Sequence, residues 1–191
     1  RKFRPQTKGR KAIASGLTTI HGASMTGFNE VQRRIKLYDV GLLRIRINEM
    51  VRESAAKKLG KPLNHDNMYF ICSVKAFADG ALGSRGALFL EEYSDYPDYF
   101  GEPRQNEDQI AKSATELLKI GFNMRIHCIG DAANRIAINA YERALKATGT
   151  DGKKARFALE HCQVLTKEDV PRLKELGIIA SMQPLHATED M

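Results

Sequence analysis

Two histidines in this sequence have the type and the places that a metal site would require, and a lysine stands where a lysine is unusual. His127 and His161 each end an apolar segment that predicts a β-strand, and Lys75 lies inside another such segment. Neutral imidazole is the commonest protein ligand for zinc and similar ions. Neighbouring strands lie about 4.8 Å apart, so two histidines at their ends could reach one ion. Two histidines at unrelated spacings are also typical of ordinary core or loop positions, and both interpretations stay open.

The stretch from Cys72 to Ala87 is locally the most unusual part of the chain, because Lys75 stands within a predicted strand and a glycine-rich loop follows. A protonated ammonium has no lone pair for a metal, and burial favours the neutral amine. A neutral amine can react with carbon dioxide, and the resulting carbamate could bridge two cations through its two oxygens. The alternative is an ion pair between Lys75 and Asp79, which the residues alone slightly favour.

Alternating strands and helices are predicted to position these side chains. Apolar and β-branched segments predict strands over 17–20, 42–47, 68–79, 122–127, 157–161 and 178–181. Helices are predicted between them. One of these helices begins with the capping box of Asn106 and Gln109 and ends at Gly121. His21, just after the first strand, is predicted to lie in a loop.

Two of the predicted strands have one apolar side and one side with ionisable groups. Lys75 and Asp79 share a side of one strand, and Arg125 and His127 share a side of another. Helices between successive strands imply a parallel sheet covered by helices, so the polar side must face an enclosed space. An open doubly wound sheet and most of a β/α barrel both fit the six strands. Both architectures place their sites at the carboxyl ends of strands.

Size and composition indicate one sizeable globular domain, with 191 residues of which 42% are hydrophobic. Apolar runs near 20 residues are lacking, and no apolar segment follows the basic opening to make a signal peptide. The three cysteines form no C-x-x-C pair, which suggests neither a disulfide framework nor a thiolate zinc cage. We therefore expect a soluble protein located in the cytoplasm.

The formal net charge of +7 raises nucleic acid as a partner. The basic residues fall in short groups without interleaved aromatic residues, which favours solvated faces. We expect no nucleic-acid partner and no membrane partner. The G-x-x-G-x-x-G spacing of residues 80–86 matches neither the dinucleotide fingerprint nor a P-loop, so nucleotide binding is not expected.

Four ordered sequence blocks resemble the amidohydrolase superfamily, and more narrowly the family 3 amidohydrolases related to N-substituted formamide deformylase. The blocks are V-K-A-F-A-D-G-A-L-G-S-R (74–85), H-C-I-G-D-A-A (127–133), A-L-E-H-C-Q (158–163) and A-S-M-Q-P-L-H-A-T-E-D-M (180–191). The resemblance implies an α/β fold, a partial TIM-type (β/α)8 barrel with approximately strands two to seven. Residues 1–191 would form one incomplete metal-dependent hydrolase barrel domain. The implied reaction is hydrolysis of carbon–nitrogen, amide-type bonds of a small molecule through a metal-activated hydroxide.

The resemblance also implies roles for particular residues. A divalent metal, with zinc as the expected ion and one or two ions bound, would have three ligands in this chain: Lys75, His127 and His161. Lys75 would be carboxylated and would bridge the ions. Three further residues are expected to bind substrate or shape its pocket: Ser84, Arg85 and His186.

Two parts of the family pattern fall outside this sequence. The H-x-H ligand pair would precede Arg1, and the catalytic aspartate would follow Met191. No residue of the chain is therefore assigned securely as catalytic, and we predict that the chain alone is inactive or nearly so. An open barrel seam predicts that the isolated chain either associates, for example into a homo-oligomer, or is partly disordered. The alternative function is a non-catalytic, barrel-derived binding or regulatory module.

Overall fold

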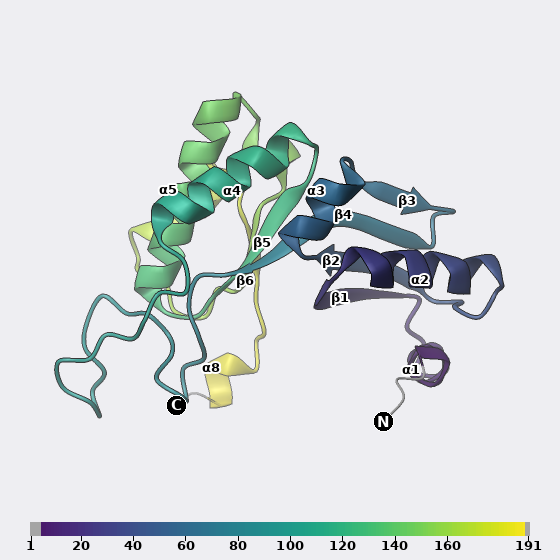
Figure 1. The fold of residues 1–191 in the computed structure, drawn as a ribbon. Helices are drawn as coiled ribbons and strands as arrows, with labels where there is room; N and C mark the ends of the chain where they lie inside the picture. Colours follow the sequence, from purple (N-terminus) through teal and green to yellow (C-terminus); the bar gives the residue numbers. More distant parts are fainter. Residues whose placement is uncertain (1–4, 190–191) are drawn as a thin grey trace. The chain divides into compact units, whose positions relative to one another are not determined.

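The computed structural model describes residues 5–189, and its contacts divide the chain into two compact units. Of the described residues, the N-terminal unit comprises 5–75 and 120–122, and the C-terminal unit comprises 76–119 and 123–189. Each unit has its own parallel strands and its own helices (Figure 1).

The N-terminal unit is built on three parallel strands. Its elements are α1 (Pro5–Ala14), β1 (Thr19–Thr26), α2 (Phe28–Asp39), β2 (Arg46–Val51), α3 (Glu53–Leu59), β3 (Leu63–His65) and β4 (Tyr69–Phe77). β1 pairs with β2 and β2 with β4, while the short β3 runs antiparallel to β4. The last two residues of β4 fall in the C-terminal unit.

A buried polar cluster and an aromatic stack fix α2 on these strands. Glu49 of β2 is fully buried, accepts a hydrogen bond from the Thr26 hydroxyl at 2.8 Å and forms an ion pair with Arg34 of α2. Tyr38 of α2 stacks on Tyr69 of β4 with ring centroids 5.5 Å apart. A buried carboxylate is tolerated when it is paired and hydrogen-bonded, so Glu49 defines how α2 lies on β2.

The C-terminal unit continues the alternation of strand and helix. Its elements after β4 are α4 (Glu107–Lys119), β5 (Asn123–Cys128), α5 (Asp131–Thr148), α6 (Gly152–Ala155), β6 (Ala158–His161), α7 (Asp169–Glu175), β7 (Ile179–Ser181) and α8 (His186–Glu189). β5 pairs with β6 and β6 with β7, all in parallel. Helices α4 and α5 lie side by side (Figure 1).

Tyr141 of α5 ties this helix to two strands. It lies fully buried, and its hydroxyl donates to the backbone carbonyls of Met124 in β5 and Ala158 in β6, each at 3.2 Å. Its ring stacks on Phe157 at 4.2 Å. Burial raises the pKa of Tyr141 well above its ordinary value, so the hydroxyl stays a neutral donor. Tyr141 therefore fixes α5 against β5 and β6, the two strands whose carboxyl ends carry candidate site residues.

The predicted alternation of strands and helices is confirmed in both units. The capping box at the start of α4 is also confirmed, because Gln109 N–H donates to the Asn106 side chain at 2.9 Å and Asn106 N–H donates to the Gln109 side chain at 3.0 Å. Strand β2 begins at Arg46, later than the predicted start at Leu42.

The prediction that His21 lies in a loop is wrong. His21 lies inside β1, which continues through Gly22 to Thr26. A side-chain Cβ at Gly22 would meet the buried carboxylate of Glu49 at 2.6 Å. Gly22 therefore leaves room for this carboxylate inside a strand, where the sequence suggested a turn.

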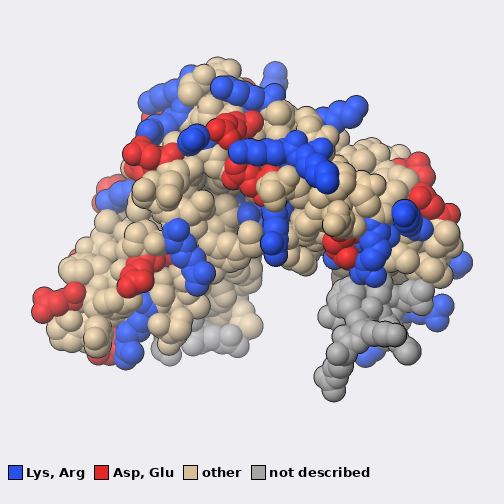
Figure 2. Space-filling view, viewed as in Figure 1, with Lys and Arg blue, Asp and Glu red and all other residues tan. Residues whose placement is uncertain are grey.

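Charged side chains of both signs share the surface. On the face seen in Figure 2, Lys and Arg side chains lie among Asp and Glu side chains. The absence of a nucleic-acid partner stays a prediction. Across residues 5–189, no helix combines the length and the apolar character that crossing a bilayer requires.

Candidate metal-binding site

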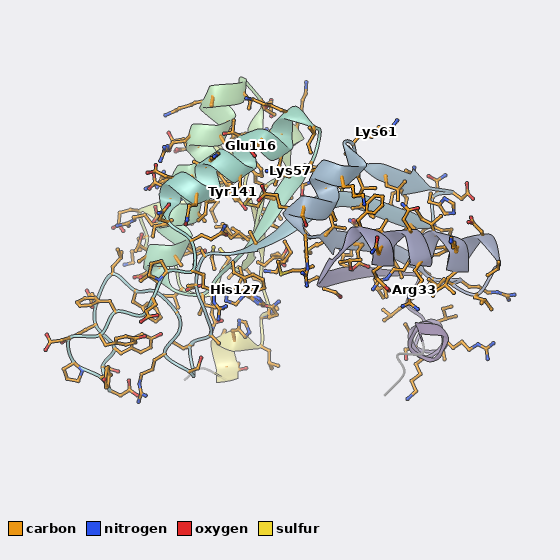
Figure 3. All side chains as sticks on the ribbon, viewed as in Figure 1. Arg33, Lys57, Lys61, Glu116, His127 and Tyr141 are labelled. Carbon is orange, nitrogen blue, oxygen red and sulfur yellow. The ribbon has the colours of Figure 1, made fainter. Side chains whose placement is uncertain are left out.

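His127 and His161 lie side by side at the carboxyl ends of β5 and β6. The parallel register of the two strands pairs Cys128 with His161. The two imidazole rings meet edge to face, with centroids 4.7 Å apart and an interplanar angle of 69°. The His127 side chain, labelled in Figure 3, is 14% exposed. The strand register thus brings together two of the three predicted ligands.

The ring of His127 is oriented by the backbone at the start of the loop after β4. Its Nε2 lies 3.0 Å from the carbonyl oxygen of Gly80. A carbonyl oxygen only accepts hydrogen bonds, so Nε2 carries the proton. The lone pair of the neutral ring is then on Nδ1. The ring of Phe77 lies against His127 with centroids 5.4 Å apart.

His161 stands on a strained piece of backbone. His161 and Cys162 have φ angles of +75° and +48°, in the left-handed region that side chains rarely adopt. Such strain persists where the surrounding structure over-determines it, often at functional sites. The Nδ1 of His161 lies 2.9 Å from Oε1 of Gln183. This amide oxygen accepts, so Nδ1 donates and the lone pair of the neutral ring is on Nε2.

Asp79, just after β4, accepts hydrogen bonds from backbone N–H groups of three other residues near the two histidines. It is fully buried, and its carboxylate accepts hydrogen bonds from Leu88 N–H at 3.0 Å, Ile129 N–H at 3.0 Å and Gly130 N–H at 2.9 Å. We call this arrangement the Asp79 clasp. Burial raises the pKa of the Asp79 carboxyl, against the opposing effect of these N–H donors and of His127. The clasp joins the end of β4 to the loop after it and to the turn between β5 and α5.

The loop over residues 80–106 is held by its own aromatic side chains. Tyr93 donates to the carbonyl of Ala87 at 2.8 Å, and its ring contacts Phe89 edge to face at 5.1 Å and Tyr99 at 5.9 Å. The loop also approaches the turn before α5, because a Cβ at Gly130 would lie 1.9 Å from the carbonyl oxygen of Leu88. A long loop packed in this way keeps a defined shape without regular secondary structure.

The three residues predicted to bind substrate or shape its pocket lie in the same C-terminal unit. The Ser84 hydroxyl donates to the Ala81 carbonyl at 3.3 Å, and the exposed Arg85 guanidinium pairs with Asp95 at 2.8 Å. Both side chains thus make their observed contacts within the loop. The His186 ring lies 6.1 Å from that of His161, and its Nδ1 is buried without a hydrogen-bond partner among the described residues.

Lys75 belongs to the N-terminal unit and is buried, with 6% of its surface exposed. Burial disfavours a charged ammonium, which agrees with the chemistry predicted for this side chain. Its carboxylation stays a prediction.

The donor groups of the C-terminal unit suit a divalent metal in part. Within residues 5–189 no cluster of three or more His, Cys, Asp or Glu side chains is placed to hold an ion. The two imidazoles still fit ligand roles, because each has one nitrogen hydrogen-bonded to an oxygen and a lone pair on the other. Cys162 does not fit, because burial raises the pKa of its thiol to about 11.

Sequence reasoning missed three features of this site: the Gly80 carbonyl, the backbone donors of the Asp79 clasp, and the contact of Gln183 with His161. Main-chain groups leave no mark in a side-chain pattern. Gln183 did stand in a recognised block, directly after the last predicted strand, where parallel strands bring their ends to one edge.

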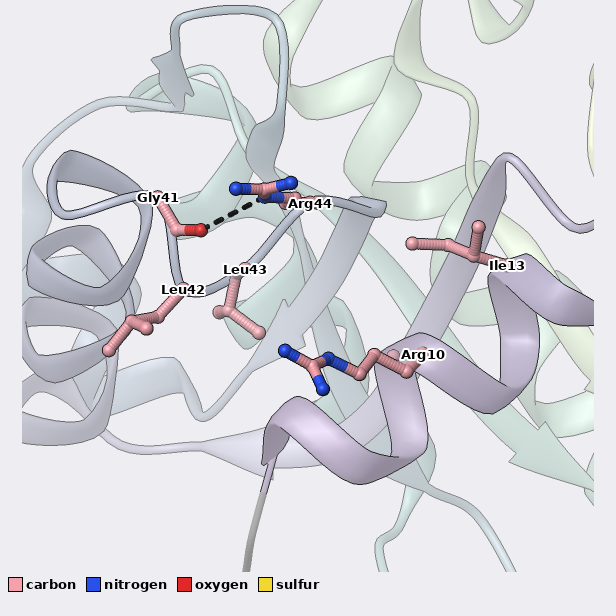
Figure 4. A pocket seen from close by; sticks show the side chains of 7 residues that line it. Arg10, Ile13, Gly41, Leu42, Leu43 and Arg44 are labelled. Carbon is pink, nitrogen blue, oxygen red and sulfur yellow. Dashed lines mark hydrogen bonds between the residues drawn. The ribbon is translucent and has the colours of Figure 1, made fainter.

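A separate hollow of about 280 Å³ lies in the N-terminal unit, between α1 and the segment before β2 (Figure 4). It is lined by Gly9, Arg10, Ile13, Gly41, Leu42, Leu43 and Arg44. Two of these lining residues are hydrogen-bonded to each other, because the Arg44 side chain donates to the Gly41 carbonyl at 3.3 Å. None of the predicted site residues lines this hollow.

Comparison with known proteins gives matches along almost the whole chain. The family model described as "Amidohydrolase family" matches residues 8–191. "Protein LONG AFTER FAR-RED 3" of Arabidopsis thaliana is 38% identical over 121 residues, which are 63% of this chain and 20% of that protein. "Putative amidohydrolase YtcJ" of Bacillus subtilis is 27% identical over 180 residues, 92% of this chain and 33% of that protein. The chain thus spans a third or less of these curated relatives.

Two solved structures resemble the fold closely. The crystal structure of an uncharacterized metal-dependent hydrolase from Pyrococcus furiosus aligns with 97% of this chain and 38% of its own, with a TM-score of 0.82 and 25% identity. A second, from Pyrococcus horikoshii, aligns with 97% of this chain and 37% of its own, with a TM-score of 0.81 and 23% identity. The predicted fold class, an α/β partial barrel, is confirmed by this likeness.

Proposed function

This chain belongs to the amidohydrolase family, as its sequence blocks predicted, and we propose that it forms part of a metal-dependent hydrolase of non-peptide carbon–nitrogen bonds. The substrate class would be small molecules with amide-type bonds. The observation that carries the proposal is the pair of histidines at neighbouring strand ends. Their ring centroids lie 4.7 Å apart, and one nitrogen of each ring is hydrogen-bonded to an oxygen. The likeness to metal-dependent hydrolases supports the metal.

We propose His127 and His161 as ligands of a divalent ion, through Nδ1 and Nε2 respectively. Zinc is the favoured ion because imidazole nitrogen suits it well, although such nitrogen ligands also suit other divalent ions. When bound, the ion would polarise the substrate carbonyl and lower the pKa of a coordinated water. Lys75 is proposed as the carboxylated bridging ligand, supported by the family blocks and by its burial.

The other residues of the site would orient groups and exclude water. Asp79 is already engaged by three backbone N–H groups, so we assign it to holding the loop and the turn in place. His186 is proposed to contact the substrate, since its Nδ1 has no partner among the described residues and its ring lies near His161. Ser84 and Arg85 would act through the shape of the loop, supported by their hydrogen bonds within it.

The proposal is tested on the full-length protein that contains this chain. Metal content and hydrolysis of a panel of N-acyl and N-formyl amines are measured for the wild type and for His127→Asn and His161→Asn. We expect both variants to lose metal and to fall at least tenfold in hydrolysis, because each removes an imidazole ligand. His65→Asn is the matched control, since His65 of β3 pairs with Asp39 in the N-terminal unit.

Intact mass of the native full-length protein tests the carboxylated Lys75 separately. A wild type that purifies without metal and hydrolyses none of the amides would contradict the proposed function. In that case the non-catalytic binding or regulatory module becomes the better hypothesis. The 191-residue chain assayed alone tests the predicted inactivity of the chain by itself.

A further inference from the structure

Gln183 makes a hydrogen bond to one of the proposed metal ligands from outside the strands that carry them. Its side-chain oxygen lies 2.9 Å from Nδ1 of His161, across 22 residues of sequence. The amide oxygen has lone pairs and no proton, so the imidazole nitrogen is the donor. This contact fixes which nitrogen of His161 holds the proton and which holds the lone pair.

We propose that Gln183 is a positioning residue for the metal, which holds His161 in the tautomer with its proton on Nδ1 and directs Nε2 to the ion. The inference rests on the proposed function. In metal sites, partners that bind the second nitrogen of a ligating histidine set its ring orientation and its basicity. Gln183 meets that description by its geometry, and it is not itself placed as a ligand.

The sheet brings Gln183 to this place. β6 and β7 pair with Glu160 opposite Ser181, and the Ser181 hydroxyl donates to the Glu160 carboxylate at 2.9 Å. One residue beyond Glu160 is His161, and two residues beyond Ser181 is Gln183. The pairing of the two strand ends therefore sets the distance between the two side chains.

Local backbone chemistry limits how far either partner can move. Pro184 restricts the residue before it to extended conformations, which limits the main chain of Gln183. On the other side, His161 and Cys162 occupy the left-handed region with φ of +75° and +48°. A strained strand end alone does not select a tautomer, because both ring nitrogens of a neutral imidazole can carry the proton. The acceptor supplied by Gln183 makes that selection.

Three variants of the full-length protein separate a positioning role from a merely structural one. Gln183→Leu removes the acceptor and puts a branched apolar side chain of similar volume in its place. Gln183→Glu keeps an oxygen acceptor, which as a carboxylate binds the Nδ1 proton more strongly. Met182→Leu is the matched control at the neighbouring exposed position. Melting temperatures of the metal-free proteins check that each variant folds.

The first measurement is the affinity for Zn²⁺, by competition with a chelating indicator. We expect Gln183→Leu to bind Zn²⁺ about 10–100-fold more weakly, the usual loss for removal of an outer partner of a ligating histidine. Gln183→Glu should retain affinity within a few-fold of the wild type, and Met182→Leu should equal it. Equal affinity of the Leu variant and the wild type would overturn the proposal, as would a Glu variant as weak as the Leu variant.

The second measurement is the tautomer of His161 in the metal-free protein, from long-range ¹H–¹⁵N spectra of histidine-labelled samples. We expect the proton on Nδ1 in the wild type and in Gln183→Glu, and a mixture of tautomers in Gln183→Leu. A wild-type proton on Nε2 would overturn the inference even if Zn²⁺ binds. If the wild type binds no metal, the proposed function fails, while the spectra still decide whether Gln183 holds the ring.

Discussion

Asp79 has the position of a catalytic acid and the contacts of a structural residue. It follows a strand and lies 3.6 Å from Nε2 of His127, so a role in proton transfer is the first hypothesis its position suggests. Its carboxylate, however, accepts from three backbone N–H groups, those of Leu88, Ile129 and Gly130. A buried acceptor with this many donors stabilises the segments that provide them.

The role of Asp79 is tested by Asp79→Asn in the full-length protein. The amide keeps the volume of the side chain and replaces one acceptor oxygen by an NH₂ group, which then faces backbone donors. We expect a loss of about 1–3 kcal/mol in the free energy of unfolding, the usual range for a buried polar group left without a partner. The loss is measured by urea unfolding.

Asp108→Asn is the matched control for this variant, because Asp108 is 82% exposed and its pair with Arg143 lies on the surface. Surface ion pairs contribute little to stability, so this control should unfold close to the wild type. Equal free energies of unfolding for Asp79→Asn and the control would show that the clasp does not stabilise the fold.

At this scale the sequence predicted the types of residue better than their contacts. His127 and His161 could be identified from their places at strand ends, and the structure brings their rings together. The clasp could not be predicted, because its donors are main-chain groups, two of them about 50 residues away, which look the same in every sequence. Gln183 could be placed near the site, but its contact depends on the pairing of β6 with β7.

The element that matters most for the site is the loop over residues 80–106, which takes its shape from packing. The ring of Tyr93 contacts those of both Phe89 and Tyr99, and the backbone of Leu88 lies close to Gly130. Gly130 has an ordinary φ of −73°, so its requirement for glycine is one of space and not of backbone conformation.

Gly130→Ala should therefore disturb the loop and the start of α5 together. Its Cβ would lie 1.9 Å from the Leu88 carbonyl oxygen, a distance that only backbone movement can relieve. We expect the free energy of unfolding to fall by about 1–3 kcal/mol, the usual cost of overpacking. The fall is measured as a shift in the midpoint of urea unfolding. Gly83→Ala is the control in the same loop, because nothing lies within 4 Å of its added Cβ. A Gly130→Ala variant as stable as Gly83→Ala would contradict the close packing.

Long helices were predictable from sequence, and short elements were not. The capping box and apolar stripe of α4 predicted it well, because a period of 3.6 residues is repeated over several turns. β3, α6 and α8 have only three or four residues each, too few for any period to show. In β4 the pairing with β2 shifts register between Asn48 and Met50, with two steps along β2 against three along β4. Such a bulge interrupts strict alternation of the two faces, on which the prediction of a polar side depended.

For the whole molecule, periodicity predicted only that strands and helices alternate. That pattern suits an open doubly wound sheet and a barrel equally, so the prediction of a partial barrel depended on the resemblance of four sequence blocks. The likeness to a solved metal-dependent hydrolase confirms this fold class. The end strands of the described sheet are short of partners. β1 pairs only with β2, and β7 only with β6, among the strands that the structure describes.

A strand with an unpaired side is a template for a second chain, so we predict that the 191-residue chain alone self-associates. Ala180→Lys places a charge at an exposed position of β7 and should weaken this association, because charged side chains disfavour edge pairing. Ala147→Lys adds the same charge at an exposed position of α5 and serves as control. Sedimentation velocity over a concentration series measures both. Association that is equal in the two variants would exclude β7 as the contact.

The Asp79 clasp also has a consequence for the order in which the protein is made. During synthesis Asp79 leaves the ribosome nine residues ahead of Leu88 and about 50 residues ahead of Ile129 and Gly130. A contact between residues so far apart forms only after the chain between them has been closed into a loop, at an entropic cost that nearby contacts do not have. Until β5 and the turn after it have emerged, Leu88 N–H is the one donor of the three that the carboxylate can reach. His127, the proposed metal ligand on β5, and the clasp that holds the loop beside it therefore reach their final places at the same step, once β5 and the turn after it have been made.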